Sequence, residues 1–310
     1  MSYISERKAV VITRLTRVDE LVRRFNNMTQ AAFYVRKMGG DIEDYIEEDR
    51  VYKSAVSASV GRLQAMLRVQ QVDREFVPNF MFGDDDIVVV IGQDGLVANA
   101  LKYLRGQPLI AVNPEPARYD GVLLPFREPD LDAVVRDVLG GRRPGREITM
   151  AIARLNDGQR LLAVNDFFIG RQSHVSARYS IRIGGMEENQ SSSGIIVSTG
   201  LGSTGWLKSV VAGARGVAGA IIGHELPAGA EAPGWDSDFL YYSVREPFPS
   251  KVTGTGLVFG KITDSPLFIA SQMAEGGVIF SDGVEQDFLQ FNSGIEAEIS
   301  VAARKGRIVV

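Results

Sequence analysis

Ile87-Val-Val-Val-Ile-Gly-Gln-Asp-Gly95 is the strongest structural signal in the chain, since five large aliphatic residues run directly into two glycines, an amide and an acid. An unbroken β-branched run between turn residues is typical of a strand buried on both faces, as in a parallel sheet. After Gly95, apolar side chains recur at helical spacing as far as Leu104. The stretch therefore predicts a strand, a tight turn and the start of a helix.

The predicted turn also indicates a chemistry. Free N–H groups and the dipole at the start of a helix favour an anion, and phosphate in particular. Asp94 would lie beside that anion, where a carboxylate is unfavourable unless it binds a metal or takes a proton from an attacking hydroxyl. Phosphoryl transfer satisfies both conditions. Taken alone, Gly-x-Asp-Gly is weak evidence, because an ordinary strand-to-helix turn with a capping Asp is the more common explanation.

The surrounding segments predict an α/β domain. Lys8 to Thr13 is a strand pattern, and Val18 to Phe25 is a helix pattern behind the N-cap candidate Thr16. Residues 30–75 are mostly helical in propensity. Leu109 to Asn113 is a second short buried strand, so that strand, helix and strand form a βαβ unit, whose crossover is right-handed in nearly all proteins.

A change of pattern near residue 145 predicts two domains, which also suits a chain of 310 residues. Residues 1–145 are expected to form a Rossmann-like α/β domain. Residues 146–310 contain many short β-type segments separated by turn residues, which predicts an antiparallel β-sandwich. Within it, the Gly/Ala-rich segment Val210 to Ile222 is expected to be a closely packed helix that starts at Thr204, and Pro227 to Gly234 a surface loop.

The composition limits the possible partners. The net charge is −4 and no basic block is present, which argues against nucleic acid. With no Cys and two His, any metal would be held by carboxylates, carbonyls and phosphates, which points to Mg²⁺. No apolar run reaches membrane-spanning length and the N-terminus lacks a secretory pattern, so we expect no membrane and a cytoplasmic protein.

Two further motifs carry polar chemistry. Asn165-Asp166 ends the predicted strand Leu161 to Val164, and an adjacent amide and carboxylate can donate to and accept from a ribose diol. Asn-Asp is also a common turn. The segment Ser191 to Trp206 is rich in small hydroxyl residues and glycines and leads from a strand into a helix, which makes it a second candidate cradle for phosphate or hydroxyl groups.

In this order the motifs resemble those of the NAD kinase family, which carries Gly-Gly-Asp-Gly, then Asn-Glu, then a Gly/Thr-rich segment ending in Gly-Ser-Thr-Ala-Tyr. The matching stretches are Gly92 to Gly95, Asn165-Asp166 and Ser198 to Trp206. Val112 to Gly121 and Val278 to Gly283 also match. Ser192-Ser193-Gly194 and Trp206 are most similar to the mitochondrial-type branch.

The resemblance implies an enzyme that transfers the γ-phosphate of ATP to the 2′-hydroxyl of the adenosine ribose of NAD, with Mg²⁺ and as a homodimer or homotetramer. It implies that Asp94 orients or deprotonates that hydroxyl, and that the site lies between the two domains. The implied substrate-binding residues are Gly92, Gln93, Gly95, Asn165, Asp166, Ser193, Ser203, Thr204, Gly205 and Trp206.

Four residues depart from the family pattern. Gln93 replaces the second glycine, so that a positive φ there would be costly. Leu96 replaces a Thr, Asp166 replaces a Glu, and Ser193 stands where many members place an Asp on the nicotinamide ribose. A lipid or sugar-alcohol kinase on the same scaffold and a non-catalytic nucleotide binder stay open, as do NAD against NADH as the substrate and ATP against polyphosphate as the donor.

Overall fold

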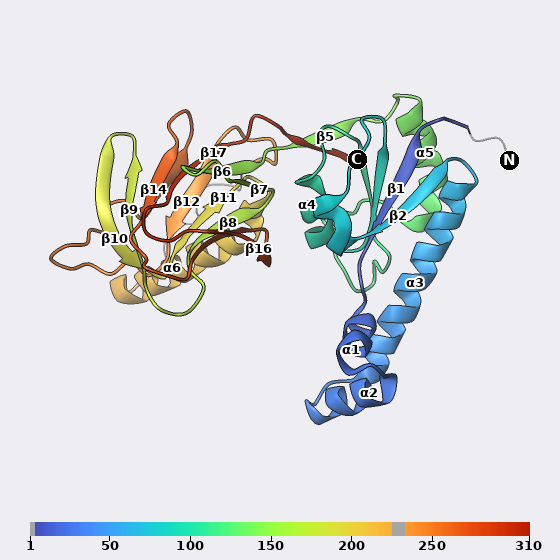
Figure 1. The fold of residues 1–310 in the computed structure, drawn as a ribbon, viewed down its shortest axis with the longest axis horizontal. Coiled ribbons are helices and arrows are strands. Elements are labelled where there is room, and N and C mark those ends of the chain that lie inside the picture. Colours follow the sequence, from blue (N-terminus) through green and yellow to red (C-terminus); the bar gives the residue numbers. More distant parts are fainter. Residues whose placement is uncertain (1–3, 225–232) are drawn as a thin grey trace. The chain divides into compact units, whose positions relative to one another are not determined.

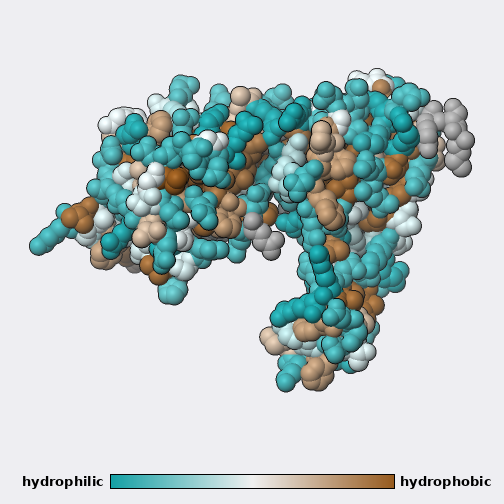
Figure 2. Space-filling view, in the orientation of Figure 1, coloured by the Kyte–Doolittle hydropathy of each residue, from teal (hydrophilic) through white to brown (hydrophobic). Residues whose placement is uncertain are grey.

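The structure is a computed structural model that describes residues 4–224 and 233–310. The chain divides into unit 1, formed by Met1–Arg146 and Arg307–Val310, and unit 2, formed by Glu147–Gly306 (Figure 1). Most of the loop expected over Pro227 to Gly234 lies outside the described residues. In the face shown in Figure 2, hydrophilic residues cover most of both units, since the long aliphatic runs are buried.

Unit 1 is built on a sheet in which β1, β2, β3, β4 and β18 pair in parallel. Its strand order is β2 (Arg68–Asp73), β1 (Lys8–Thr13), β3 (Ile87–Ile91), β4 (Leu109–Val112), β18 (Gly306–Val309) and β5 (Gly145–Ile148). All five residues of β3 are fully buried. This burial on both faces explains the unbroken aliphatic run and confirms the predicted βαβ unit, with α4 (Asp94–Leu101) as its helix.

The other helices of unit 1 include α1 (Arg17–Phe25), α2 (Met28–Lys37), α3 (Ile42–Gln64) and α5 (Leu131–Leu139), with 3₁₀ turns at Arg74–Asn79 and Glu128–Asp130. The predicted N-cap is confirmed, because the hydroxyl of Thr16 accepts from the N–H of Asp19. Figure 1 shows α1 and α2 at the end of α3 that is farthest from the sheet.

Two segments of unit 1 differ from the sequence pattern. Arg68–Asp73 is the edge strand β2 and not a continuation of the helical stretch. Its sequence, Arg-Val-Gln-Gln-Val-Asp, lacks a hydrophobic run because only Val72 is buried, while Arg68, Gln70 and Gln71 are exposed. Residues 307–310, expected within the second domain, are part of unit 1, where β18 pairs with β4.

Unit 2 contains two six-stranded sheets whose strands pair antiparallel, as the sequence predicts. The first, here called the β9 sheet, has the order β10 (Met186–Ser192), β9 (Ala177–Ile183), β14 (Leu267–Ser271), β17 (Glu296–Val301), β6 (Ala151–Leu155) and β7 (Arg160–Ala163). The second, the β8 sheet, has the order β13 (Phe259–Ile262), β12 (Leu240–Val244), β11 (Ile195–Ser198), β8 (Asp166–Arg171), β15 (Gly277–Ser281) and β16 (Val284–Gln290).

The two sheets share one apolar core. Tyr179 and Ile181 of the β9 sheet and Phe167, Ile169 and Val197 of the β8 sheet belong to the same cluster and are completely buried. Residues of the β8 sheet that alternate with these, such as Phe168, lie on the opposite face. This second face carries the residues of the candidate site.

The Gly/Ala-rich helix is present but its predicted packing is wrong. After a 3₁₀ turn at Gly202–Thr204, α6 runs from Trp206 to Ile222, so it starts two residues later than expected. Leu207 is the one buried residue of α6, and Ile221 is 80% exposed. An apolar composition therefore indicated a burial that α6 does not have among the described residues.

Candidate functional site

The Gly92–Gly95 turn has the predicted geometry. Strand β3 ends at Ile91 and α4 begins at Asp94, with Gln93 as its N-cap residue. Gln93 has φ −121° and ψ 165°, which is extended backbone, so its side chain costs no conformational strain. Among the described residues, the N–H groups of Asp94 and Gly95 have no partner, and Gly95 is exposed. The turn therefore presents free donors at a helix start, where an anion is favoured.

The Asp94 carboxylate lies beside these donors and is held by the loop that follows β4. Its Oδ1 accepts a hydrogen bond of 2.6 Å from the backbone N–H of Leu123. The loop is itself ordered by Asn113, whose side chain donates to the carbonyl of Tyr119 and accepts from the N–H of Glu115. One carboxylate oxygen of Asp94 is thus fixed by a neutral donor, which leaves the other for a ligand.

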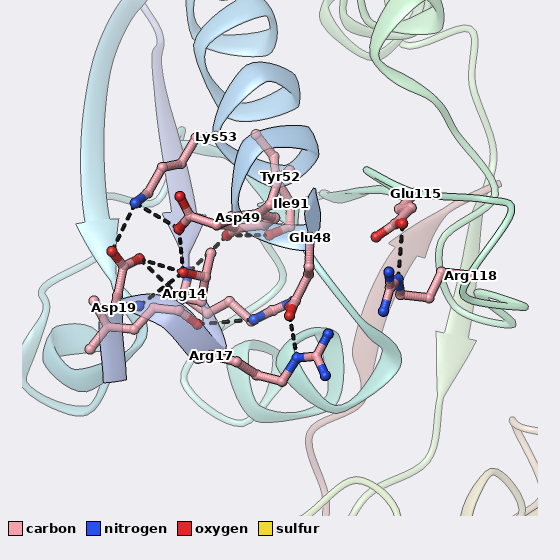
Figure 3. Close-up of polar contacts among 12 residues, drawn as sticks. Arg14, Arg17, Asp19, Glu48, Asp49, Tyr52, Lys53, Ile91, Glu115 and Arg118 are labelled. Atoms are coloured by element: carbon pink, nitrogen blue, oxygen red, sulfur yellow. Dashed lines mark hydrogen bonds and ion pairs between the residues drawn. The ribbon is translucent and has the colours of Figure 1, made fainter. Parts of the chain in front are cut away.

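Helix α3 is attached to the strand ends that precede this turn (Figure 3). The Tyr52 hydroxyl accepts from the N–H of Arg14, just after β1, at 2.9 Å and donates to the carbonyl of Ile91, the last residue of β3, at 3.0 Å. Burial raises the pKa of Tyr52 to about 12, so the hydroxyl stays protonated. One side chain therefore bridges the ends of β1 and β3 next to Gly92.

An ion-pair network supports the same edge. Glu48 of α3 is 1% exposed and accepts from the guanidinium groups of Arg14 and Arg17 (Figure 3). Burial alone would raise the pKa of Glu48, but the hydrogen bonds from both arginines outweigh it and lower that pKa. Asp44 pairs with Arg118 and Arg17, which lowers its pKa to about 2. The network ties α1 and α3 to the loop that holds Asp94.

In unit 2, the Asn165–Asp166 turn presents two polar side chains without protein partners. Asp166, the first residue of β8, is only 8% exposed, and no donor among the described residues contacts its carboxylate. Burial, with a smaller contribution from the nearby charge of Asp282, raises the pKa of Asp166 to about 7. Near neutral pH, this carboxyl group is therefore present in both its protonated and its ionised form.

The backbone of this turn is fixed by the glycine-rich segment. The Thr199 hydroxyl donates to the carbonyl of Val164 at 2.6 Å, and the Thr199 N–H donates to the carbonyl of Asn165 at 2.9 Å. Gly202 lies so close that an added Cβ would be 2.0 Å from the carbonyl oxygen of Asn165. Asn165, Thr199 and Gly202 are therefore packed backbone to backbone.

The hydroxyls of the next residues are used locally. Ser203 donates to the carbonyl of Gly200, and Thr204 donates to that of Leu201, each three residues earlier. Trp206 lies nearly parallel to the ring of Phe168, with a centroid distance of 5.8 Å, and the guanidinium of Arg245 lies 5.6 Å from the Trp206 ring. These rings form an aromatic surface on the outer face of the β8 sheet.

The structure groups most, but not all, of the predicted residues of unit 2. Asp166 pairs with Ser198 at one end of β11, whereas Ser193 lies just before the other end. At about 3.3 Å per residue, Ser193 is roughly 16 Å from Ser198 along the strand. The Ser193 side chain is exposed, and its N–H donates to the carbonyl of Arg245. Ser193 thus lies apart from Asn165 and Asp166, and Gly92 to Gly95 belong to unit 1.

Sequence reasoning missed several residues at both turns, namely Tyr52, Arg14 and Leu123 in unit 1 and Asp282 in unit 2. The Asp282-Gly283 dipeptide was visible as part of a matching stretch, but its contact with residue 165 spans more than a hundred positions. No local pattern encodes such a contact.

Three further observations concern ligands and surfaces of the described residues. They contain no cluster of three or more His, Asp or Glu side chains placed to hold a metal ion. None of their helices is both long and apolar enough to cross a bilayer. A separate hollow lined by Arg7, Lys8, Arg68 and residues 83–86 lies at the amino ends of β1 and β3, at the opposite strand ends from the Gly92–Gly95 turn.

Comparison with known proteins gives one sequence relative and many similar folds. No protein-family model matches the sequence. An NAD kinase of Cupriavidus pinatubonensis is 27% identical over 192 residues, which are 59% of this chain and 56% of that protein, so the match spans little more than half of the relative.

Two solved structures are similar over nearly the whole chain. Yeast NADH kinase complexed with NADH has a TM-score of 0.61 and 14% identity, covering 99% of this chain and 84% of its own. An NAD kinase from Archaeoglobus fulgidus in complex with ATP has a TM-score of 0.58 and 17% identity, covering 98% and 93%. At these identities the likeness confirms the fold, an α/β unit followed by a β-sandwich.

Proposed function

We propose that this chain is an NAD kinase that transfers the γ-phosphate of ATP to the 2′-hydroxyl of the adenosine ribose of NAD. The observation that carries the proposal is the carboxylate of Asp94, held by the Leu123 N–H beside the free N–H groups of Asp94 and Gly95. The likeness to NAD and NADH kinases supports the same activity.

In unit 1, Asp94 is the proposed base for the attacking hydroxyl, and the donors at the start of α4 bind phosphate. Phosphoryl transfer requires mainly alignment and neutralisation of charge, together with one group that accepts the proton of the nucleophile. Gln93 adds a side chain at this turn without backbone strain. The Gln93 side chain is therefore proposed to leave the Gly-x-Asp-Gly turn able to bind phosphate and to support catalysis.

In unit 2, Asn165 and Asp166 are the proposed ligands of the ribose. Their side chains have no protein partner within the described chain, although their backbone is fully held. Ser203, Thr204 and Gly205 are proposed to contact the adenosine, and Trp206 to pack against it. Ser193, at the other end of β11, is proposed to contact the nicotinamide ribose.

A divalent cation is proposed to enter with ATP. Mg²⁺ is commonly held by one or two carboxylates together with substrate phosphates and water. Because the described residues contain no cluster of three or more His, Asp or Glu side chains placed to hold a metal ion, the cation is proposed to be held mainly by the phosphates of ATP and by water. When bound, the ion would neutralise phosphate charge.

The activity is tested by identifying the phosphorylated product when the protein is given ATP or polyphosphate with a mixture of NAD, NADH and sugar alcohols. We expect NADP from ATP and NAD, and a loss of about 10²–10⁴-fold in Asp94→Asn. Asp84→Asn removes the same charge at the opposite end of β3 and should keep full activity. A phosphorylated sugar, or equal NADP from Asp94→Asn, contradicts the proposal.

A homodimer or homotetramer is also proposed, supported by the outer face of α6, where Val217 and Ile221 are 63% and 80% exposed. Exposed apolar patches of this kind mark interaction sites. Sedimentation of Val217→Asp/Ile221→Asp should show a smaller species than the wild type, whereas Met38→Asp, at another exposed apolar residue, should not. A monomeric wild type contradicts this assignment.

Two finer assignments stay predictions. Ser192-Ser193-Gly194 and Trp206 support placement in the mitochondrial-type branch. Cytoplasmic location is checked by fractionating cells that express the tagged chain.

A further inference from the structure

Asp282 occupies an unusual position at the turn between β15 and β16. It has φ 55°, in the left-handed region, where non-glycine residues are uncommon and Asp and Asn are among the most tolerated. Gly283 follows with φ 70°. Because β15 pairs with β8 as far as Ser281 and Phe167, the turn lies beside the start of β8.

From this position, the Asp282 carboxylate binds the backbone of three consecutive residues. Its Oδ1 accepts from the N–H groups of Val164, Asn165 and Asp166, at 3.0, 2.6 and 3.3 Å. In return, the N–H of Asp282 donates to the carbonyl of Asp166 at 2.9 Å. Successive N–H groups that converge on one oxygen form an anion-binding concavity, and here a side chain of the same chain fills it.

These bonds complete the fixation of the Asn165 backbone. Its N–H is bound by Asp282, and its carbonyl is bound by the N–H of Thr199. The side chains of Asn165 and Asp166 are then the remaining polar groups of the turn, and neither has a protein partner within the described chain.

We propose that Asp282 is a positioning residue for NAD: by clamping the N–H groups of Val164, Asn165 and Asp166, it holds the Asn165 and Asp166 side chains in the orientation that binds the ribose. This inference rests on the proposed function, because it assigns the ligand of the turn as NAD. This role is exerted through the backbone of the turn, which is what the Asp282 carboxylate contacts.

Two variants distinguish the role of the Asp282 side-chain acceptor from the effect of the positive φ at this position. Asp282→Asn keeps an amide oxygen in the position of Oδ1 and tolerates positive φ. Asp282→Gly also tolerates positive φ but removes the acceptor. Asp157→Gly is the matched control, since Asp157 precedes a positive-φ Gly158 in an exposed turn of the same unit and accepts from the N–H of Gln159.

The first measurement is amide hydrogen exchange of the peptide covering residues 160–170. We expect faster exchange in Asp282→Gly and near wild-type exchange in Asp282→Asn and Asp157→Gly, because the clamp protects three consecutive amides. Equal exchange in Asp282→Gly and the wild type would overturn the clamp. This readout needs no activity, so it stands if the proposed function fails.

The second measurement is the dissociation constant of NAD by calorimetry, with the KM values for NAD and ATP. Asp282→Gly should raise the dissociation constant of NAD at least tenfold and leave the KM for ATP within threefold of the wild-type value. Asp282→Asn should keep the dissociation constant of NAD within threefold of the wild-type value. Faster exchange with unchanged NAD affinity would overturn the positioning role. Failure of the proposed function would show in a different experiment, the product assay, in which the wild type would make no NADP.

Discussion

The carboxylate of Asp94 accepts a hydrogen bond of 2.6 Å from the backbone N–H of Leu123, a residue 29 positions later. The orientation of the proposed base therefore depends on a loop whose contribution is a neutral donor. Mutations can therefore test the charge of this carboxylate and its position independently of each other.

Asp94→Glu keeps the charge but lengthens the side chain by one methylene, so the carboxylate cannot keep both its place and its bond to Leu123. We expect kcat to fall about 10²-fold, as for a displacement near 1 Å, with the KM for ATP nearly unchanged. Steady-state kinetics of this variant beside Asp94→Asn checks it. Wild-type kcat in Asp94→Glu would show that the Leu123 contact has no role.

Gln93→Gly restores the family pattern, yet the backbone of Gln93 is already extended. We therefore expect a change in turnover below threefold and a change in the free energy of unfolding of only a few tenths of a kcal/mol, since Gly is tolerated at an N-cap. A tenfold gain in kcat would mean that the Gln93 side chain obstructs the phosphate.

Gly202→Ala introduces a Cβ 2.0 Å from the carbonyl oxygen of Asn165, where backbone must move. We expect NAD affinity to fall at least tenfold and unit 2 to lose stability. Gly213→Ala is the control, because its Cβ would point into open space on α6 and should stabilise the helix by about 1 kcal/mol. Thermal melts with and without NAD separate the two effects.

Asp166 predicts the pH dependence of unit 2. Its pKa is raised in the folded chain to about 7, so its contribution to stability is fully present below pH 4 and is lost as the pH rises through 7. Asp166→Asn should therefore stabilise unit 2 at pH 8 by on the order of 2–4 kcal/mol and have little effect at pH 4 or below. The sequence has two Trp, Trp206 and Trp235, and both lie in unit 2, so Trp fluorescence follows its unfolding.

Glu48 predicts the opposite trend in unit 1. Its lowered pKa means that its stabilisation is present above about pH 4.3 and is lost as the pH falls. Glu48→Ala leaves the guanidinium groups of Arg14 and Arg17 without their buried partner and should cost about 3 kcal/mol. Glu47→Ala, which removes an exposed pair with Arg50, should change the stability far less, because water and salt screen that pair. Hydrogen exchange of α3 reports on both, and equal effects would contradict the network.

The elements predicted well are those whose signals are local. The aliphatic run of β3, the N-cap of α1 at Thr16 and the alternation of β9 follow from burial and capping within a few residues. Strand β2 was not predictable, because an edge strand with solvent-facing side chains carries no hydrophobic periodicity. The exposure of α6 was missed for the opposite reason, since its composition matches that of a buried helix.

The residues of the candidate site also fall into those with a local sequence signal and those without one. Gly92 to Gly95 and Asn165-Asp166 were visible because strand ends and turn residues mark them. Leu123 acts through its backbone, which any residue except Pro supplies, so the sequence carries no trace of it. Asp282 is a side chain, but the residues it binds become its neighbours only when β15 pairs with β8.

Strands β5 and β18 are neighbours in the sheet of unit 1, and all of unit 2 is inserted between them. The polypeptide thus leaves and re-enters unit 1 through adjacent strands. Unit 2 can therefore be removed as one piece: a few flexible residues joining Ile148, the end of β5, to Gly306, the start of β18, should close the sheet without it. The same connection offers a route to exchange unit 2 for the corresponding unit of another protein, while unit 1 keeps its fold.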